Sequence, residues 1–314
     1  MSTLTASTGG AQPAAPPKVF SLRAKLVLLA AGLVLVPAAV YGVISLSSSR
    51  AALTQVIGRQ LVEEARSGAD RLAGVLRSDH ERLRGLAAQD VMREIRIADL
   101  DKRIAGLLMS VQRGCEACVG LAVLDAGGRV VAASQPGWLG KTADTLPGGS
   151  GAGGLIEGPL RNTGVPAALL RFTVPVPDPD RRDASLGWLI ALMDWDRELA
   201  VLAHERQSLL SVGLDVEVLA VDAAGVMIGG AGREAGPWRL GDRVSVDDET
   251  DAGEGHLDGA AGMLLGRAPL GPGLPRWSVV VATPLAEAHA PARRMAQQLA
   301  TALAATLVVA LALA

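Results

Sequence analysis

Residues 119–134 read VGLAVLDAGGRVVAAS, and this stretch decides the class of fold. An apolar run ends in an aspartate, a glycine turn follows, and a second apolar run begins, which is the pattern of a β-hairpin. The pattern returns at 216–230 as VEVLAVDAAGVMIGG. In such turns an aspartate bonds its own backbone and a glycine takes a positive φ. Two pairs of turn residues correspond: Asp125 with Asp222, and Gly128 with Gly225.

The ends of the two repeated units also match. The segments 186–194 (LGWLIALMD) and 275–283 (PRWSVVVAT) each run from a tryptophan into an apolar strand, which aligns Trp188 with Trp277. Units that begin and end alike indicate a duplicated α+β domain with antiparallel sheets. We therefore expect two modules along the chain, one at 113–205 and one at 206–291.

A long helix is predicted to precede the first module. Residues 47–112 contain no proline, apolar residues recur at helical spacing, and charged residues fill the other faces. We expect a stalk helix over this range, with one break around Gln89–Asp99. Such a helix would carry both modules and would pair with a second copy of itself, so we expect a homodimer.

Two apolar stretches have the length of membrane spans. Residues 26–46 and 295–314 contain no charged side chain, and a helix needs roughly 20 apolar residues to cross a bilayer. Basic residues cluster before the first stretch, which predicts a cytoplasmic N-terminus. We expect transmembrane helices at 26–46 and 295–314, a disordered cytoplasmic tail at 1–25, and an extracytoplasmic region at 47–294 of a bacterial inner membrane protein. Because the sequence stops within the second stretch, we also expect an output region beyond it.

Composition and motifs exclude several classes of function. A formal net charge of −2 and 3% aromatic residues provide no footprint for nucleic acid. We find no nucleophile-and-base motif, so these residues predict no catalytic centre, and the question of enzymatic activity passes to the expected output region. The histidines have no metal-ligand spacing, and we expect neither a metal nor a cofactor.

Cys115 and Cys118 are the only cysteines and form a C-E-A-C motif. Outside the cytoplasm a disulfide can form and persist. The residue after Cys118 is Val119 rather than histidine, which argues against attachment of a c-type haem. Two interpretations stay open, a local structural disulfide and a redox-sensing pair.

Taken together, the spanning stretch, the long helix, the two hairpins and the segment RWSVVVATPLAEAHAP at 276–291 resemble the double Cache (PAS-like) extracytoplasmic sensors of bacteria over residues 26–314. The resemblance implies a membrane-distal and a membrane-proximal Cache module that sense a small molecule. It also implies an output, for which we expect a histidine kinase first and a chemotaxis transducer or a diguanylate cyclase as alternatives. The family's amino-acid-binding variant carries an Arg-x-Trp-Tyr cluster, and the segment 140–170 has neither tryptophan nor tyrosine. A membrane-anchored scaffold without a ligand is a further alternative.

The strands of the first module suggest where a ligand would bind. Period-2 alternation places Leu169, Arg171 and Thr173 on one strand face. On the next strand, Trp188 and Asp194 share a face, and Asp194 stands where the resembling family has an end-of-strand aspartate. We predict Arg171, Trp188 and Asp194 as ligand-binding residues. The alternative is that Arg171 and Asp194 form a surface salt bridge and that Trp188 belongs to the core.

Overall fold

The structure is a computed structural model, and it describes residues 22–96, 101–147, 149, 155–161, 163–181, 184–211, 215–231, 236–245, 255–258 and 261–313. Most of the predicted tail at 1–25 lies outside these residues. The chain divides into two compact units. One unit comprises residues 1–51 and 290–314, and the other comprises residues 52–289.

Helix α1 is longer at its start and shorter at its end than the predicted stalk. It runs without interruption through Leu22–Ala87 and contains Pro37. The 3-10 helix η1 (Asp90–Arg96) follows, within the segment where we expected a break, and α2 (Asp101–Arg113) begins after it. The predicted stalk is therefore helical as far as Ala87 and again from Asp101, and η1 lies inside the predicted break at Gln89–Asp99.

The stretches predicted to span a membrane are helical. Residues 26–46 lie in α1, and residues 295–313 lie in α6 (Ala290–Leu313). Inside this unit, Gly42 of α1 lies directly against the side chain of Leu299 of α6. Within the part of the chain that the structure describes, no helix is long and apolar enough to cross a membrane.

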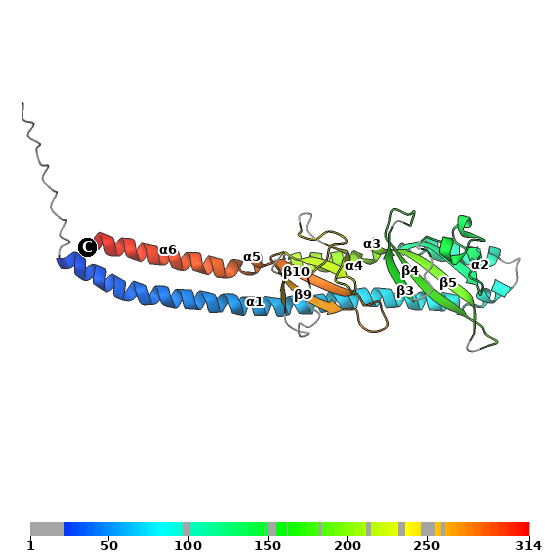
Figure 1. The fold of residues 1–314 in the computed structure, drawn as a ribbon, viewed down its shortest axis with the longest axis horizontal. Coiled ribbons are helices and arrows are strands. Elements are labelled where there is room, and N and C mark those ends of the chain that lie inside the picture. The colour runs from blue at the N-terminus through cyan, green and yellow to red at the C-terminus, as the bar shows by residue number, and fades with distance from the viewer. Residues whose placement is uncertain are drawn as a thin grey trace, which may run out of the picture. The chain divides into compact units, whose positions relative to one another are not determined.

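The second unit contains two sheets that follow one another along α1 (Figure 1). Both are five-stranded and antiparallel, and they have the same strand order. The first sheet has the order β2-β1-β5-β4-β3, and the second has β7-β6-β10-β9-β8. This equivalence confirms an α+β chain with two antiparallel sheets and a long N-terminal helix. The strands are β1 (Cys118–Asp125), β2 (Val130–Ala133), β3 (Ile156–Leu160), β4 (Leu169–Pro177), β5 (Ser185–Asp194), β6 (Glu217–Val221), β7 (Met227–Ala231), β8 (His256–Asp258), β9 (Met263–Pro269) and β10 (Ser278–Pro284).

The two hairpin turns have the predicted chemistry. Oδ1 of Asp125 accepts hydrogen bonds from the backbone N–H groups of Gly127 and Arg129, both at 2.9 Å. Oδ1 of Asp222 accepts the equivalent two bonds at 2.8 and 2.9 Å. The glycines at the third turn position, Gly128 and Gly225, have φ values of 77° and 75°. An L-residue rarely adopts this conformation, so each turn depends on its glycine.

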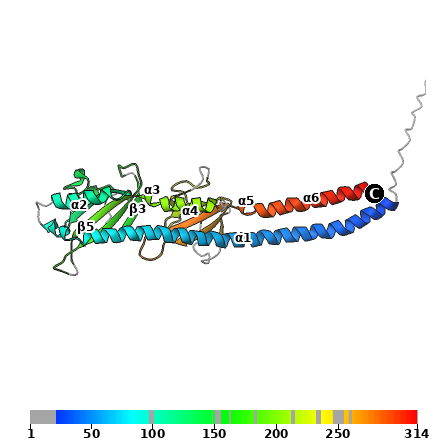
Figure 2. The same ribbon diagram turned by 180° about the vertical axis from the view of Figure 1, so that it is seen from behind.

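The second half of α1 packs against one face of both sheets (Figure 2). The apolar stripe predicted from the sequence is the buried face of this helix, and burying one leucine there contributes roughly 2 kcal/mol. From the sheets, alternate residues such as Phe172 and Val279 complete the same core. The buried residues of the stripe include Leu61, Ala65, Ala69, Leu72, Leu76, Leu83 and Leu86.

The short helix α3 (Trp195–Glu198) and helix α4 (Ala200–Ser211) connect the sheets. Trp195 is fully buried, and its indole N–H donates to the carbonyl of Ile228 in β7 at 2.8 Å. Its ring lies 5.3 Å from the ring of Trp277, centroid to centroid. Trp195 therefore attaches the end of the first sheet to the second sheet.

The predicted equivalence of Trp188 and Trp277 is wrong by one residue. Trp188 pairs with Leu124, and in the second sheet the matching residue Val221 pairs with Ser278. Trp277 belongs to the core that faces α1, whereas Trp188 lies on the opposite side of its sheet. A shift of one residue along a strand exchanges the two faces, so matching aromatic residues alone misplaced the register.

Candidate functional site

The face of the first sheet that points away from α1 is the candidate site. The register confirms the predicted alternation, because Arg171 lies opposite Leu192 and Thr173 lies opposite Ile190. Segments between β2 and β4 cover this face, including the 3-10 helices η2 (Pro136–Trp138) and η3 (Ala143–Thr145). The apolar residues of the covered face and its cover are Ala122, Leu124, Val130, Ala133, Trp138, Ala143, Leu146, Leu160, Val165, Leu169, Ile190 and Leu192.

Arg171 is the charged residue at the centre of this face. Its residue surface is only 1% exposed. One terminal nitrogen donates to the carbonyl of Gly149 in the covering segment, and Nε has no hydrogen-bond partner among the described residues. Burial lowers the pKa of the Arg171 guanidinium, while the charges of Glu157 and Asp144 act in the opposite direction. Among the described residues, the site thus holds a desolvated cation with one unpaired donor, which is costly unless an acceptor is supplied.

Thr173 adds a second unused polar group. It lies two residues from Arg171 on the same face of β4, and its Oγ1 is buried without a hydrogen-bond partner among the described residues. A hydroxyl and a guanidinium N–H can both donate to the same anionic group. These two residues therefore define the polar part of the candidate site.

Trp138 is a residue of the site that sequence reasoning missed. Its ring lies against Gly120 of β1, where a Cβ atom would be only 2.3 Å from the indole. Gly120 pairs with Leu192, which in turn pairs with Arg171, so the ring covers the strand row that contains the cation. A strand glycine is a recognised mark of close approach, and the tryptophan in the P-G-W sequence after the hairpin was the available signal.

Trp188 takes little part in the candidate site. It is 41% exposed and lies opposite Leu124 and Pro175, toward the other end of β5 from Asp194. Its side chain belongs to neither core cluster of the first sheet among the described residues. The alternative that placed Trp188 in the core is therefore wrong, and a ligand contact of Trp188 stays a prediction.

Asp194 lies on the candidate face but has a structural task. As the N-cap of α3, its side chain accepts from the backbone N–H groups of Asp196, at 3.0 Å, and Arg197, at 3.4 Å. A carboxylate in this position stabilises the start of a helix. Among the ion pairs of the described residues, none joins Asp194 to Arg171. The structure brings the two residues to one face without pairing them.

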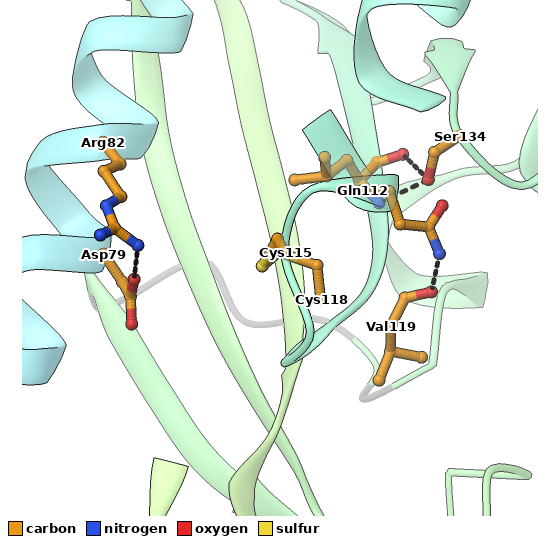
Figure 3. Close-up of a disulfide and its surroundings, with 8 residues drawn as sticks. Asp79, Arg82, Gln112, Cys115, Cys118, Val119 and Ser134 are labelled. Atoms are coloured by element: carbon orange, nitrogen blue, oxygen red, sulfur yellow. Dashed lines mark hydrogen bonds and ion pairs between the residues drawn. A yellow bond between two sulfur atoms is a disulfide. The ribbon is translucent and has the colours of Figure 1, made fainter. Parts of the chain in front are cut away.

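Cys115 and Cys118 form a disulfide in the turn between α2 and β1 (Figure 3). Both cysteines are half-buried. Next to the disulfide, the Gln112 amide donates to the carbonyl of Val119 at 2.8 Å, which attaches the end of α2 to β1. The bond therefore closes a short loop at the start of β1. In the described part of the chain, no three His, Cys, Asp or Glu residues gather closely enough to hold a metal ion.

The second sheet has a similar covered face with different chemistry. Trp238 lies in its cover, as Trp138 does in the first sheet. In each sheet the central strand, β5 or β10, leads directly into a short helix. When the two sheets are aligned on that junction, Leu265 of β9 corresponds to Arg171 of β4. Glu217 is buried at the start of β6. A buried cation at this position is therefore a feature of the first sheet.

Comparison with known proteins identifies the fold. Neither a protein-family model nor a curated protein sequence matches the chain. An extracellular ligand-binding receptor of Desulfohalobium retbaense matches with a TM-score of 0.52 and 13% identity, over 71% of this chain and 40% of the receptor. The chain shares its fold with extracellular ligand-binding sensor domains. The resemblance noted in the sequence is thereby confirmed at the level of the fold.

Two further sensor domains match over nearly their whole length. The extracellular domain of a proposed histidine kinase, rpHK1S-Z16, has a TM-score of 0.50 and 12% identity, and covers 72% of this chain and 93% of its own. The ligand-binding domain of the Pseudomonas fluorescens chemoreceptor CtaA, solved with L-isoleucine, has a TM-score of 0.50 and 13% identity, over 76% and 97%. This sensor fold therefore occurs in receptors with different outputs.

Proposed function

We propose that the chain is the extracytoplasmic input region of a bacterial membrane receptor and that its first sheet binds a small molecule with a carboxylate group. The observation that carries this proposal is Arg171, a buried guanidinium whose Nε has no partner among the described residues. A guanidinium presents its donors in the geometry that a carboxylate accepts, and Thr173 offers a further donor on the same face.

Similar sensor domains support a ligand of this kind. CtaA was solved with L-isoleucine and the chemoreceptor PctB of Pseudomonas aeruginosa with L-Gln, and both compounds carry a carboxylate. In this chain the charges of Glu157 and Asp144, which act on Arg171, would also attract an ammonium group. The proposal therefore includes amino acids as well as simple carboxylic acids.

The membrane placement rests on the sequence. We propose that residues 26–46 and 295–314 span the inner membrane, with a cytoplasmic N-terminus and residues 47–294 outside. For the output we propose a histidine kinase, and the likeness to CtaA makes a chemotaxis transducer the second candidate. We also propose that the receptor is a homodimer that signals by a small shift of its helices.

A thermal-shift screen of the full chain in detergent tests the ligand proposal. The compounds are carboxylic acids, amino acids, amines and purines. A ligand that binds the native state raises the unfolding midpoint. We expect a shift with a carboxylate compound, its loss in Arg171→Met, which removes the charge but keeps much of the length, and a smaller shift in Arg171→Lys.

The matched control is Arg267→Met, because Arg267 lies on the corresponding face of the second sheet and donates to Ser278 at 3.1 Å. This variant should keep the wild-type shift. An equal shift in Arg171→Met, or a shift lost only in Arg267→Met, would contradict the assignment to the first sheet.

Alkaline phosphatase fused after residue 290 tests the proposed topology. The fusion should be active in cells, because the enzyme would lie outside the cytoplasm, and inactivity there would refute the topology.

A further inference from the structure

An acidic residue interrupts the buried face of α1. The apolar stripe passes through Leu72, Leu76 and Leu83, and Asp79 lies on the same side of the helix between the last two. Its side chain is only 13% exposed. A carboxylate among leucines loses its water and requires a compensating partner.

The partner of Asp79 is a second acid, Glu198, on the connecting helix α3. The two side chains share a hydrogen bond, although two ionised carboxylates have no proton to share. Glu198 is 5% exposed, and its Oε2 has no hydrogen-bond partner among the described residues. The contact therefore requires one proton between the two groups.

Few charges near the pair could replace that proton. From α1, Arg82 lies 3.4 Å from Asp79, but 78% of its side chain is exposed to solvent. From the end of β5, the negative charge of Asp194 also acts on Glu198. The Asp194 side chain caps the start of α3, and its Oδ2 also lies 3.9 Å from Nε of Arg197.

We propose that Asp79 and Glu198 form a proton-binding site that fastens α3 to α1 when it holds one proton and loosens this contact when the proton leaves. Glu198 shares the four residues of α3 with Trp195, which attaches to the second sheet. Proton release would therefore act on the connection between the two sheets. This makes external pH an input to the receptor in addition to its ligand.

A neighbouring contact between the connecting helices and α1 uses an arginine instead of a proton to neutralise a buried acid. On α4, Glu205 is 3% exposed, and it forms an ion pair with Arg71 of α1 at 2.6 Å. Both contacts join a buried acid of the connecting helices to α1. One acid is neutralised by an arginine and the other by a proton, so Glu205 provides a matched control for Glu198.

The electrostatics give the expected direction of the pH dependence. Burial and the nearby Asp79 raise the pKa of Glu198 to about 8 from an ordinary value of 4.5, and burial also raises the pKa of Asp79. The folded state thus holds a proton that the unfolded chain releases. The stabilisation is complete below about pH 4.5 and is lost as the pH rises toward 8. The lowered pKa of His80 acts in the opposite direction.

Urea unfolding of the full chain in detergent between pH 5 and 9 tests the proposal. The quantity to compare is the ratio of the unfolding equilibrium constants of the wild type and Glu198→Gln. As the pH rises toward 8, this ratio should increase, by roughly tenfold per pH unit at its steepest. Glutamine can donate to Asp79 at every pH, so Glu198→Gln should lack this component. Taking the difference between the two proteins cancels the contribution of His80. Glu205→Gln should keep the component that Glu198→Gln removes, although the pKa of Glu64, which Glu205 helps to raise, falls in this variant.

An infrared titration provides a readout that does not depend on folding differences. The wild type should show a protonated carboxyl band at pH 7 that is absent from Glu198→Gln and from Asp79→Asn and that disappears above pH 8. Identical pH dependence in the wild type and Glu198→Gln, or no protonated carboxyl at pH 7, would overturn the proposal.

Discussion

Arg171 illustrates how one residue can mark a binding site without any motif. Its strand alternation predicted which face it occupies, and the register bears this out. What the alternation could not predict is that a covering segment would remove the guanidinium from water while leaving Nε unpaired among the described residues. Desolvation of that kind arises from tertiary packing. The desolvated guanidinium is therefore better evidence for ligand binding by Arg171 than its strand position alone.

Gly120 is the residue on which the cover depends. In Gly120→Ala the new methyl group would overlap the Trp138 ring, so the ring must move or the strand must shift. We expect the free energy of unfolding to fall by about 1–3 kcal/mol and the ligand-induced shift to weaken. Urea unfolding measures the first effect. Gly137→Ala, where nothing lies within 4 Å of the new atom, should change stability by less than about 0.5 kcal/mol.

Three neighbouring residues of α3 and its N-cap have different structural roles. Asp194 caps it, Trp195 attaches it to the second sheet, and Glu198 is the acid that we propose shares a proton with Asp79 of α1. The aspartate that the sequence suggested for a ligand is thus engaged by its own helix. Capping is local, and an aspartate before a short helix could have been recognised as an N-cap from the sequence.

Substitution of Asp194 separates capping from ligand binding. Asp194→Ala removes the acceptor for two backbone N–H groups, and we expect a loss of about 1 kcal/mol in the free energy of unfolding. Asp194→Asn keeps an acceptor and should restore most of this loss. If both variants keep the carboxylate-induced thermal shift, capping is the role of Asp194. A shift that disappears in Asp194→Asn at wild-type stability would instead show a ligand contact.

The disulfide at the start of β1 should matter moderately for stability. Cys115 and Cys118 are three residues apart, so the bond closes a very short loop and restricts the unfolded chain little. Replacing both by serine should lower the free energy of unfolding by about 2 kcal/mol or less. Urea unfolding with and without reductant measures this. If the ligand-induced shift depends on the redox state, the redox interpretation is favoured.

For the whole molecule, the repeated pattern predicted more than the individual long-range contacts. The hairpins at Asp125 and Asp222 and the two antiparallel sheets follow from short-range patterns, and they are present. The relation between Trp188 and Trp277 required the register, which aromatic identity does not determine. The contacts of Trp138 and Glu198 join segments far apart in the chain, so no local period could reveal them.

The two sheets share one topology but differ in the chemistry of their covered faces. A buried arginine lies in the first sheet, and Leu265 takes its position in the second. We therefore expect ligand binding and signal transfer to be divided between the sheets. The first would bind, and the contacts of α3 and α1 would pass the change onward.

Hydrogen–deuterium exchange on the full chain, with and without a carboxylate found in the screen, tests this division most directly. Peptides covering 136–147 and 155–161 should become protected when the compound binds, and 236–245 should remain unchanged. In Arg171→Met the protection should disappear. Protection confined to 236–245, or protection of 136–147 that persists without Arg171, would contradict a ligand site on the first sheet.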